Sequence, residues 1–371
     1  MKILIINWRS ITDPLKGGAE VVTFEHARRW ASKHNAEITW ICAKYDKNKD
    51  FEEFEGIKFL YLGNELRRDS IFSLLLSFPY FFFLVYQTYQ NKFKGKVDVV
   101  IDQIHGIPFL TPLYVKEKVI LYIHEVAGEI WNKMFPFPIN SLGIFLERML
   151  LKFYKNITVI TGSNSTKKDL LDLGFNSKSI KIVEHGINLK PINKKTKKFT
   201  SFTILFLNRM VKMKGPERAL EIFKKLKKEV PEAKLIMIGK GEKEYINELK
   251  EISKNLGINK DVEFLGFISE EEKISYLQNS HVLINTSFKE GWGLVNIEAN
   301  TQGTPAVAFD VEGCRDSIKN GINGYISKDE NDFVKNILKI RSIDLNESSI
   351  EFSRKFDWEI KSEDFYKEIS K

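Results

Sequence analysis

The stretch Glu290-Gly-Trp-Gly-Leu-Val-Asn-Ile-Glu298 guides the interpretation of the whole chain. Two glycines, Gly291 and Gly293, follow its first carboxylate, and an apolar run with helical spacing comes next. This pattern predicts a loop that leads into a helix. The N-terminus of a helix presents unpaired N–H groups and a partial positive charge, so it suits a phosphate group. The glycines would let the backbone approach such a ligand closely.

The two carboxylates of this stretch indicate a second kind of contact. Glu298 lies about two helical turns beyond Glu290, so both side chains can border one groove. Carboxylates do not bind phosphate, but they accept hydrogen bonds from hydroxyl groups. A phosphate with hydroxyl-rich groups on both sides is a nucleotide sugar. The alternative is a capped surface helix, which the two carboxylates alone do not exclude.

Composition limits the class of protein and its partners. The 371 residues are enough for two domains, and the apolar fraction of 43% indicates a globular core. The net charge of +8 admits nucleic acid, an anionic membrane or a phosphorylated substrate as partner. Because the charge is spread over lysine-rich helices without a basic–aromatic stripe, nucleic acid is disfavoured. The distant Cys42 and Cys314 match no metal-binding spacing, which predicts a reduced, cytosolic protein.

One apolar segment bears on the membrane question. Ile71–Tyr89 approaches the length of a membrane span. Pro79 lies in the middle of it, and Ser77 and Gln87 interrupt the apolar run. We therefore predict a kinked, buried helix, and contact with a membrane interface is the alternative. The start of the chain, residues 1–9, is too short an apolar run for a signal peptide and predicts a first strand.

Short apolar runs alternate with helical stretches along the whole chain, which is typical of parallel strands covered on both faces. In the first half we predict strands at Lys2–Ile6, Glu37–Ile41, Ile57–Tyr61, Val97–Ile101, Val119–Ile123, Ile157–Thr161 and Ile180–Val183. In the second half we predict them at Phe202–Leu207, Lys234–Ile238, Val262–Leu265, Val282–Asn285 and Pro305–Phe309. The lysine-rich segment 189–200 is the predicted linker between the halves. A cleft between two such halves holds ligands at the carboxyl ends of strands.

A basic segment follows the first strand of the second half. It reads Asn208-Arg-Met-Val-Lys-Met-Lys-Gly215 and supplies Arg209 and Lys214. Arginine offers a bidentate fork and lysine a point charge, so the pair would clamp a diphosphate and stabilise it as it leaves. The alternative is a basic surface turn. The position at the carboxyl end of a strand favours the functional interpretation.

Two glycine motifs follow other strands. Paired glycines in Gly17-Gly18-Ala19-Glu20 precede a helix that runs to about His34, and their N–H groups would face a diphosphate, although such a pair is more often a plain turn. The segment Gly239-Lys-Gly-Glu242 begins like a dinucleotide-binding fingerprint but lacks its third glycine. A nicotinamide-dependent dehydrogenase is therefore disfavoured.

Histidines supply a further candidate. His105 and His124 each end an apolar strand, and His124, which precedes Glu125, is the stronger candidate because parallel-sheet sites form at such ends. A hydrogen-bonded turn histidine is the alternative. His26 and His34, on the first helix, are expected to be surface or packing residues. The sequence contains no metal-binding cluster, nucleophile elbow or Walker loop.

Taken together, these residues resemble the retaining, nucleotide-sugar-dependent glycosyltransferases of the GT-B fold, family four (glycosyltransferase group 1). The resemblance covers nearly the whole chain and keeps the order of the motifs. Its most specific part joins Glu290 and Glu298 to Arg209 and Lys214. Further matches are Gly17-Gly18-Ala19-Glu20, His124-Glu125, His185-Gly-Ile-Asn188, Gly239 with Gly241, Gly303-Thr-Pro305 and Gly321-Ile-Asn-Gly324.

The resemblance implies two Rossmann-like domains that face each other across a cleft. An N-terminal acceptor domain would span residues 1–188, the linker 189–200 and a C-terminal donor domain 201–355. Residues 356–371 would form a helix that packs back on the first domain.

The resemblance also implies a role for each matching residue. The residues implied in catalysis are Arg209 and Lys214 at the leaving diphosphate, Glu290 at the donor sugar and His124 at the reacting sugar and acceptor. The residues implied in donor binding are Gly17, Gly18, Gly241, Gly291, Gly293 and Leu294, with Phe267 near the base and Glu298 at the ribose. No metal or cofactor would be needed, because protein cations replace the metal.

The implied reaction moves a hexose-type sugar from a UDP- or GDP-linked donor to a hydroxyl of a glycan or lipid-linked glycan, with retention at the anomeric carbon. Two alternatives remain at this stage, a nucleotide-sugar epimerase of the same fold and a non-catalytic nucleotide-sugar-binding protein. The implied location is cytoplasmic, with peripheral contact of Ile71–Tyr89 and Phe135–Pro138 with the inner face of an anionic membrane.

Overall fold

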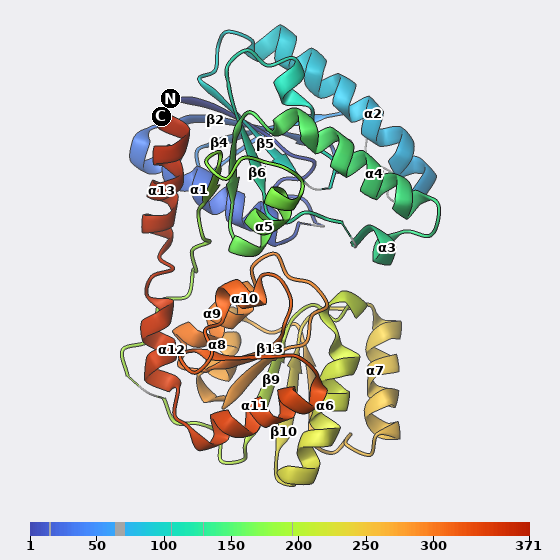
Figure 1. The fold of residues 1–371 in the computed structure, drawn as a ribbon, viewed down its shortest axis with the longest axis vertical. Helices are drawn as coiled ribbons and strands as arrows, with labels where there is room; N and C mark the ends of the chain where they lie inside the picture. The colour runs from blue at the N-terminus through green and yellow to red at the C-terminus, as the bar shows by residue number, and fades with distance from the viewer. Residues whose placement is uncertain (15, 64–70, 105, 129, 195) are drawn as a thin grey trace. The chain divides into compact units, whose positions relative to one another are not determined.

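The chain forms two compact units, each with its own sheet (Figure 1). This computed structural model describes residues 1–14, 16–63, 71–104, 106–128, 130–194 and 196–371. The first unit comprises 1–186 together with 358–371, and the second comprises 187–357. The last fourteen residues thus return to the unit in which the chain began.

The described residues of the first unit form an eight-stranded sheet with the order β3-β4-β2-β1-β5-β6-β7-β8. The strands are β1 Lys2–Ile6, β2 Glu37–Ala43, β3 Phe51–Phe54, β4 Ile57–Leu62, β5 Val99–Ile104, β6 Lys118–Ile123, β7 Thr158–Thr161 and β8 Ile180–Ile182. The helices are α1 Gly18–His34, α2 Ile71–Thr88, α3 Ile130–Met134, α4 Ile139–Leu151, α5 Asn164–Asp172 and α13 Trp358–Ser370. All neighbouring strands are parallel except β3 and β4, which form an antiparallel pair.

Helices cover both faces of this sheet. Leu4 pairs with Val100, so their side chains share one face, and this face packs against Phe81 and Val85 of α2. On the same face, Leu121 packs against Leu151 at the end of α4. The opposite face is covered by α1 and α13.

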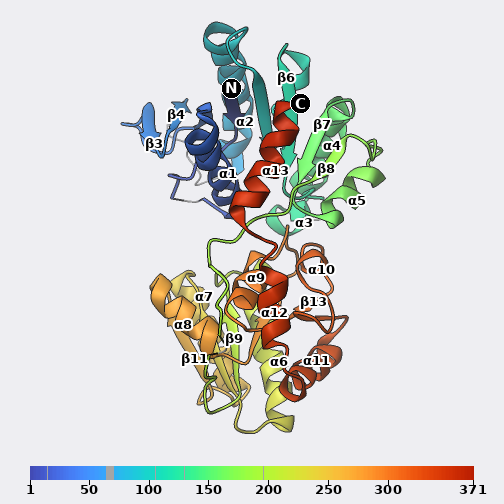
Figure 2. The same ribbon diagram turned by 90° about the vertical axis from the view of Figure 1, so that its left-hand side faces the viewer.

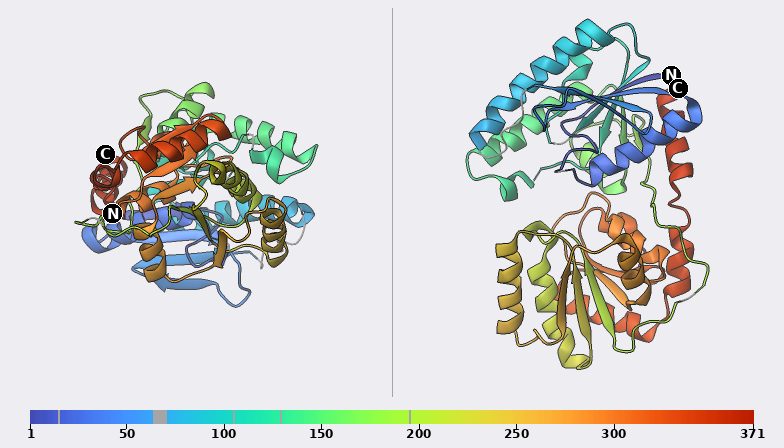
Figure 3. Two further views of the ribbon diagram at one scale, coloured as in Figure 1. Left: turned by 90° about the horizontal axis from the view of Figure 1, so that it is seen from below. Right: turned by 180° about the vertical axis from the view of Figure 1, so that it is seen from behind.

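The last helix, α13, lies beside α1 (Figures 2 and 3). The Trp30 indole donates a hydrogen bond of 3.0 Å to the carbonyl of Ser362, and the Trp30 and Phe365 rings meet edge to face at 5.0 Å. His26 is fully buried between these rings and Tyr122, so of the two expected roles it has the packing one. The prediction that the C-terminal helix packs on the first domain is confirmed.

The apolar segment that begins at Ile71 forms α2, but between residues 77 and 88 this helix is buried on one face only. Phe81 and Val85 are at most 2% exposed, whereas Tyr80, Phe83 and Tyr86 are 45–58% exposed. The prediction of a buried helix was therefore half right. None of the helices in the described ranges is long and apolar enough to cross a membrane.

The described residues of the second unit form a six-stranded parallel sheet with the order β11-β10-β9-β12-β13-β14. The strands are β9 Thr203–Leu207, β10 Lys234–Ile238, β11 Val262–Gly266, β12 Val282–Asn285, β13 Ala306–Phe309 and β14 Gly324–Ser327. The helices are α6 Pro216–Glu229, α7 Lys243–Asn255, α8 Glu270–Asn279, α9 Leu294–Thr301, α10 Cys314–Ser317, α11 Glu330–Ser342 and α12 Asn346–Ser353.

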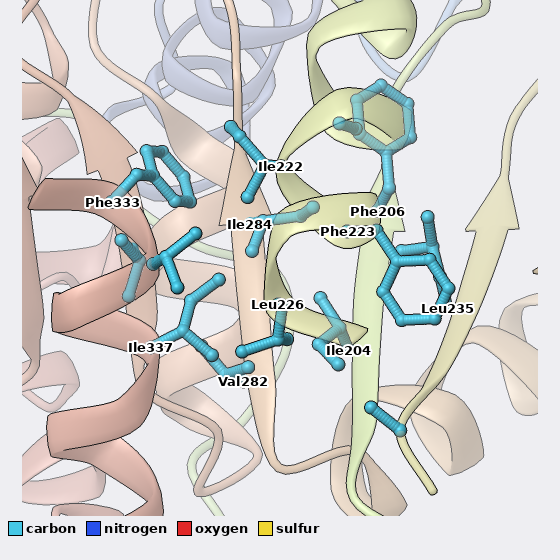
Figure 4. Close-up of a cluster of buried hydrophobic side chains, with 14 of the residues drawn as sticks. Ile204, Phe206, Ile222, Phe223, Leu226, Leu235, Val282, Ile284, Phe333 and Ile337 are labelled. Atoms are coloured by element: carbon cyan, nitrogen blue, oxygen red, sulfur yellow. The ribbon is translucent and has the colours of Figure 1, made fainter. Parts of the chain in front are cut away.

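The core of the second unit follows from the apolar faces of its helices. Phe223 and Leu226 of α6 lie against Ile204 of β9 and Ile337 of α11 (Figure 4). Residues 190–194 pack on this unit: the Ile192 N–H donates to the carbonyl of Thr301 at 2.9 Å. Lys198 also packs on this unit, and its ammonium donates to the carbonyls of Gln278 and Gly303.

Candidate active site

The sheet of the second unit changes direction between β9 and β12. From β9 the chain adds β10 and β11 on one side, and it then returns to add β12 on the other side. The loops that follow β9 and β12 therefore start at the carboxyl ends of adjacent strands and lead to helices on opposite faces of the sheet, α6 and α9. Ligands of open parallel sheets bind at such a switch point. The predicted Arg209 and Lys214 belong to the first of these loops, and Glu290 belongs to the second.

Direct contacts hold these two loops together. The Lys214 ammonium lies 2.6 Å from Oε1 of Glu290, and the Ser287 hydroxyl donates to the same oxygen at 2.7 Å. Both charged side chains are largely buried, with exposures of 17% for Lys214 and 11% for Glu290. The Thr286 hydroxyl donates to the carbonyl of Gly215 at 2.7 Å. The sheet thus brings a cation and a carboxylate of the sequence prediction into one ion pair.

Gly215 explains how the loops come so close. Its φ of 65° is left-handed, and a Cβ atom there would lie 2.3 Å from the carbonyl oxygen of Thr286. A residue with a side chain would therefore force the loops apart and move the adjacent Lys214.

The loop after β12 rests on a buried polar network. Gly293 caps α9 with a φ of 77°, and a Cβ atom there would meet Asn296 Nδ2 at 2.8 Å and Ser317 Oγ at 2.9 Å. Asn296 Nδ2 donates to Ser317 Oγ, and Asn285 Nδ2 donates to Asn296 Oδ1. The network fixes the first turn of α9, where Gly291, Gly293 and Leu294 were predicted to meet phosphate.

Glu298 lies in the second turn of α9 and is 28% exposed. Its Oε1 lies 3.7 Å from the ammonium of Lys273 on α8. Burial raises the pKa of the Glu298 carboxyl, the nearby Lys273 opposes this rise and Glu270 adds to it. Glu298 does not contact Glu290 in any hydrogen bond or ion pair found among the described residues.

The glycines of the loop after β10 have a packing role. Gly239 has a φ of 152°, and a Cβ atom there would lie 1.7 Å from the carbonyl oxygen of Asn208. A Cβ atom on Gly241 would lie 2.6 Å from Met210 Cβ, and the Met210 N–H donates to the carbonyl of Lys240 at 2.7 Å. These glycines let the loops after β9 and β10 touch. This contact accounts for the glycines of the segment 239–242 without a dinucleotide-binding fingerprint.

Two exposed side chains flank these loops. Phe267, in the turn after β11, is 73% exposed, and the Lys240 ammonium stands 4.0 Å from the centre of its ring. Arg209 is also exposed, and within the described ranges it makes no ion pair. Both side chains remain accessible to a ligand at this edge of the second unit's sheet.

The first unit holds the other predicted residues. The Gly17 N–H donates to Oε2 of the buried Glu20 at 2.6 Å, so the helix's own carboxylate already satisfies this group. A Cβ atom on Gly18 would meet nothing within 4 Å. Of the two glycines, Gly18 is the one with open space beside it.

His124 directly follows β6 and is partly buried. Its Nε2 lies 3.2 Å from Nε2 of Gln103, and its carbonyl accepts from the Thr166 hydroxyl at 3.0 Å. Gln103 is fully buried and also donates to the carbonyl of Ala19. This amide therefore connects His124 with the N-terminus of α1. His105 lies outside the described residues.

The described ranges contain no group of three His, Cys, Asp or Glu side chains that could hold a metal ion.

Comparison with known proteins agrees with this arrangement. The profile of Glycosyltransferase Family 4 matches residues 16–190, and that of Glycosyl transferases group 1 matches 190–356. This chain belongs to that glycosyltransferase family. An uncharacterized glycosyltransferase of Methanocaldococcus jannaschii is 26% identical over 88% of this chain and 86% of its own length. Members of the family retain the anomeric configuration and use a nucleotide-sugar donor.

Other relatives match in part or by fold. The alpha-monoglucosyldiacylglycerol synthase of Streptococcus pneumoniae is 32% identical over 45% of this chain, and the match spans only 37% of the synthase. The structure of HepE from Anabaena with UDP and glucose has a TM-score of 0.73 at 17% identity and covers 100% of this chain and 99% of its own. The GT-B fold predicted from the sequence is confirmed.

Three polar residues of this glycosyltransferase contact or support the predicted ones but were not expected from the sequence. Ser287 holds Glu290, Asn296 supports Gly293, and Gln103 contacts His124. Each is an uncharged polar residue near the carboxyl end of a strand or in the first turn of a helix. That position is the signal by which the sequence could have shown them.

Proposed function

We propose that this glycosyltransferase moves a hexose from a UDP- or GDP-linked donor to a hydroxyl of a glycan or lipid-linked glycan. The observation that carries the proposal is the ion pair of Lys214 with Glu290, held by Ser287 at the switch point of the second unit. A phosphate-binding cation and a hydroxyl-binding carboxylate lie side by side there, which matches the junction between the diphosphate and the sugar of such a donor.

Lys214 and Arg209 act on the diphosphate in this proposal. When the donor binds, the Lys214 ammonium exchanges its contact with Glu290 for a phosphate oxygen, and the exposed Arg209 takes a second oxygen with its fork. Both cations stabilise the negative charge that develops as the diphosphate leaves. This is why we propose a reaction that needs no metal ion.

Glu290, released from Lys214, accepts hydrogen bonds from hydroxyls of the donor sugar, and Ser287 keeps its carboxylate in orientation. Glu298 holds the ribose, and Phe267 offers its exposed ring to the base. The bond between the anomeric carbon and the diphosphate breaks, and the acceptor oxygen forms the new bond on the same face. The acceptor proton passes to the departing diphosphate.

We assign the acceptor side to the first unit. His124 borders the reacting sugar, and the N–H groups near Gly18 face the donor phosphates. Glycines 241, 291 and 293 and the N–H of Leu294 complete the donor site by bringing backbone close to it.

Two helices of the first unit support a lipid-linked acceptor. Tyr80, Phe83 and Tyr86 are exposed on α2, and α4 exposes an apolar stripe. The stripe consists of Leu142, Phe145, Met149 and, just beyond the helix, Phe153. The exposed Arg148 and Lys152 lie beside it. Aromatic and basic side chains together favour an anionic lipid interface, so we propose peripheral membrane contact there.

Vesicle flotation tests this contact. The wild type should float with vesicles that contain anionic phosphatidylglycerol and should do so less in high salt, because the attraction is partly electrostatic. The double variant Phe145→Ser, Lys152→Ser should remain at the bottom of the gradient. Equal flotation of wild type and variant would contradict the assignment of α4.

A thermal-shift and turnover screen tests the function itself. UDP-glucose, UDP-galactose, UDP-N-acetylglucosamine and GDP-mannose are compared, and at least one should raise the unfolding midpoint, since a ligand of the folded state stabilises it. Transfer of the sugar to an added acceptor should follow. Isomerised donor without transfer would support an epimerase, and absence of any stabilisation would contradict donor binding.

A further inference from the structure

A buried carboxylate on α4 holds the segment that follows His124. Glu147 is 1% exposed. Its Oε1 accepts from the N–H of Ala127 at 2.7 Å, and its Oε2 accepts from the N–H of Gly128 at 2.9 Å and from the Trp131 indole at 3.1 Å. All three donors lie within seven residues of His124, whereas Glu147 reaches them from another helix.

A glycine one turn earlier on α4 completes this arrangement. A Cβ atom on Gly143 would lie 2.3 Å from Cε3 of Trp131, so the indole ring lies directly on the helix backbone. Gly143 and Glu147 are four residues apart and therefore share one face of α4. The glycine makes room for the ring, and the carboxylate binds the ring's N–H.

Residues 124–128 are thus held at both ends, on either side of Glu125 and Val126. At its start, the carbonyl of His124 accepts from Thr166 on α5. At its end, Ala127 and Gly128 are held by Glu147. The two oxygens of one carboxylate accept from both N–H groups and from the indole, so a single side chain of α4 restrains Ala127, Gly128 and Trp131 together.

We propose that Gly143 and Glu147 act as a clamp that keeps residues 124–128 in the shape that receives the acceptor, which makes Glu147 a positioning residue for acceptor binding. This inference rests on the proposed function, in which His124 borders the reacting sugar. Glu147 itself need not touch either substrate. Its effect reaches the reaction through the orientation of the backbone beside His124.

The chemistry of the clamp distinguishes between substitutions. Glu147→Gln keeps the size of the side chain, but its amide offers one accepting oxygen to three donors, and its NH₂ group faces an N–H. Trp131→Phe keeps the ring on Gly143 and loses a single donor. Glu147→Gln should therefore have the larger effect.

Asp102 supplies a matched control. This buried carboxylate of β5 accepts from the Thr111 hydroxyl at 2.7 Å and also from Tyr154, but it holds the segment 109–111. Asp102→Asn should destabilise the first unit in a similar way without loosening residues 124–128.

Hydrogen exchange and kinetics test the proposal together. In Glu147→Gln, the amides of Ala127 and Gly128 should exchange at least about tenfold faster, and in Asp102→Asn they should not. With UDP-glucose as donor and n-octyl β-D-glucopyranoside or diacylglycerol vesicles as acceptor, Glu147→Gln should raise the acceptor KM about tenfold and leave the donor KM within about twofold. Trp131→Phe should give a smaller rise.

Two results would overturn the proposal. One is unchanged exchange at Ala127 and Gly128 in Glu147→Gln, since the clamp would then not hold the segment. The other is an equal change of donor and acceptor KM in Glu147→Gln and Asp102→Asn, which would reduce Glu147 to a general contribution to stability. Failure of the wild type to transfer sugar is a different result, because it contradicts the proposed function while the exchange measurement still reports on the clamp.

Discussion

Lys214 has two partners in this protein, the carboxylate it contacts now and the diphosphate we propose for it. Replacing it by Ala removes the cation from the leaving group, and loss of one such donor costs roughly 3 kcal/mol of transition-state stabilisation, or about a hundredfold in kcat/KM. Steady-state kinetics with the donor identified by the thermal-shift screen measure this loss. Lys212→Ala, an exposed neighbour in the same loop, is the control and should stay within about twofold. Near-normal turnover of Lys214→Ala would contradict its role.

His26 determines part of the response to acid. Burial, followed by the neighbouring His185 and Arg29, lowers the pKa of His26 well below its usual value near 6.5. Below that pH the unfolded chain binds a proton that the folded chain does not, so the free energy of unfolding falls as the pH falls. At one unit below 6.5 this loss amounts to about 1.4 kcal/mol.

Urea unfolding of wild type and His26→Leu at pH 7.5 and 5.5 measures this effect. The variant should lose less stability between the two pH values. Part of the pH dependence should remain, since burial also lowers the pKa of His185, to about 4. A wild type and a variant with the same pH dependence would show that His26 does not titrate in this way.

At the scale of elements, a single glycine joins the two loops that carry the ion pair. In Gly215→Ala, the new Cβ atom would meet the carbonyl of Thr286, so Lys214 should move and kcat/KM should fall by about a hundredfold. Gly257→Ala is the matched control, because Gly257 has a similar φ of 69° but nothing closer than 3.9 Å. It should cost about 1 kcal/mol of stability and no activity. Equal losses of activity would mean that backbone strain, rather than the contact with Thr286, governs the site.

The elements also show what the sequence could predict. Short apolar runs predicted the central parts of most strands. The bounds were correct for Lys2–Ile6, Lys234–Ile238 and Val282–Asn285. The strand β3 was missed because its sequence, Phe-Glu-Glu-Phe, exposes charge at an edge, and β14 because it is short and begins with a glycine. For α2, composition alone could not show which face meets the sheet, since both faces are apolar.

The candidate site also contains residues that the sequence could indicate and contacts that it could not. Residues whose chemistry is visible in one loop, such as Arg209 and Glu290, could be proposed from their position after a strand. Contacts between distant segments could not: Lys214 and Glu290 are 76 residues apart, and Glu147 lies 20 residues after Ala127 on a separate helix. Only the order of the strands in the sheet brings the first pair together. Only the packing of α4 shows that Glu147 accepts hydrogen bonds from Ala127 and Gly128.

At the scale of the molecule, the first unit is assembled from two pieces of sequence, 1–186 and 358–371, whereas the second is continuous. Removing residues 358–371 takes away Phe365, which is 1% exposed and lies against Trp30 and Tyr122. Loss of a buried aromatic side chain alone costs about 3–5 kcal/mol, so the first unit should become unstable. The second unit retains Lys214, Glu290 and Glu298.

The chain truncated after Asp357 should therefore bind the donor without transferring its sugar. Hydrogen exchange should show fast-exchanging amides in β6, next to the removed Phe365, and protected amides in β9 and β12. Isothermal titration with the donor found in the screen should give a Kd within about tenfold of the wild-type value, since most of the proposed donor contacts, those of Lys214, Glu290 and Glu298, belong to the second unit. The point variant Phe365→Ala should show the same pattern more weakly. Loss of donor binding with β9 and β12 still protected would mean that the first unit supplies most of the donor site, and the assignment of Lys214, Glu290 and Glu298 as its main contacts would be wrong.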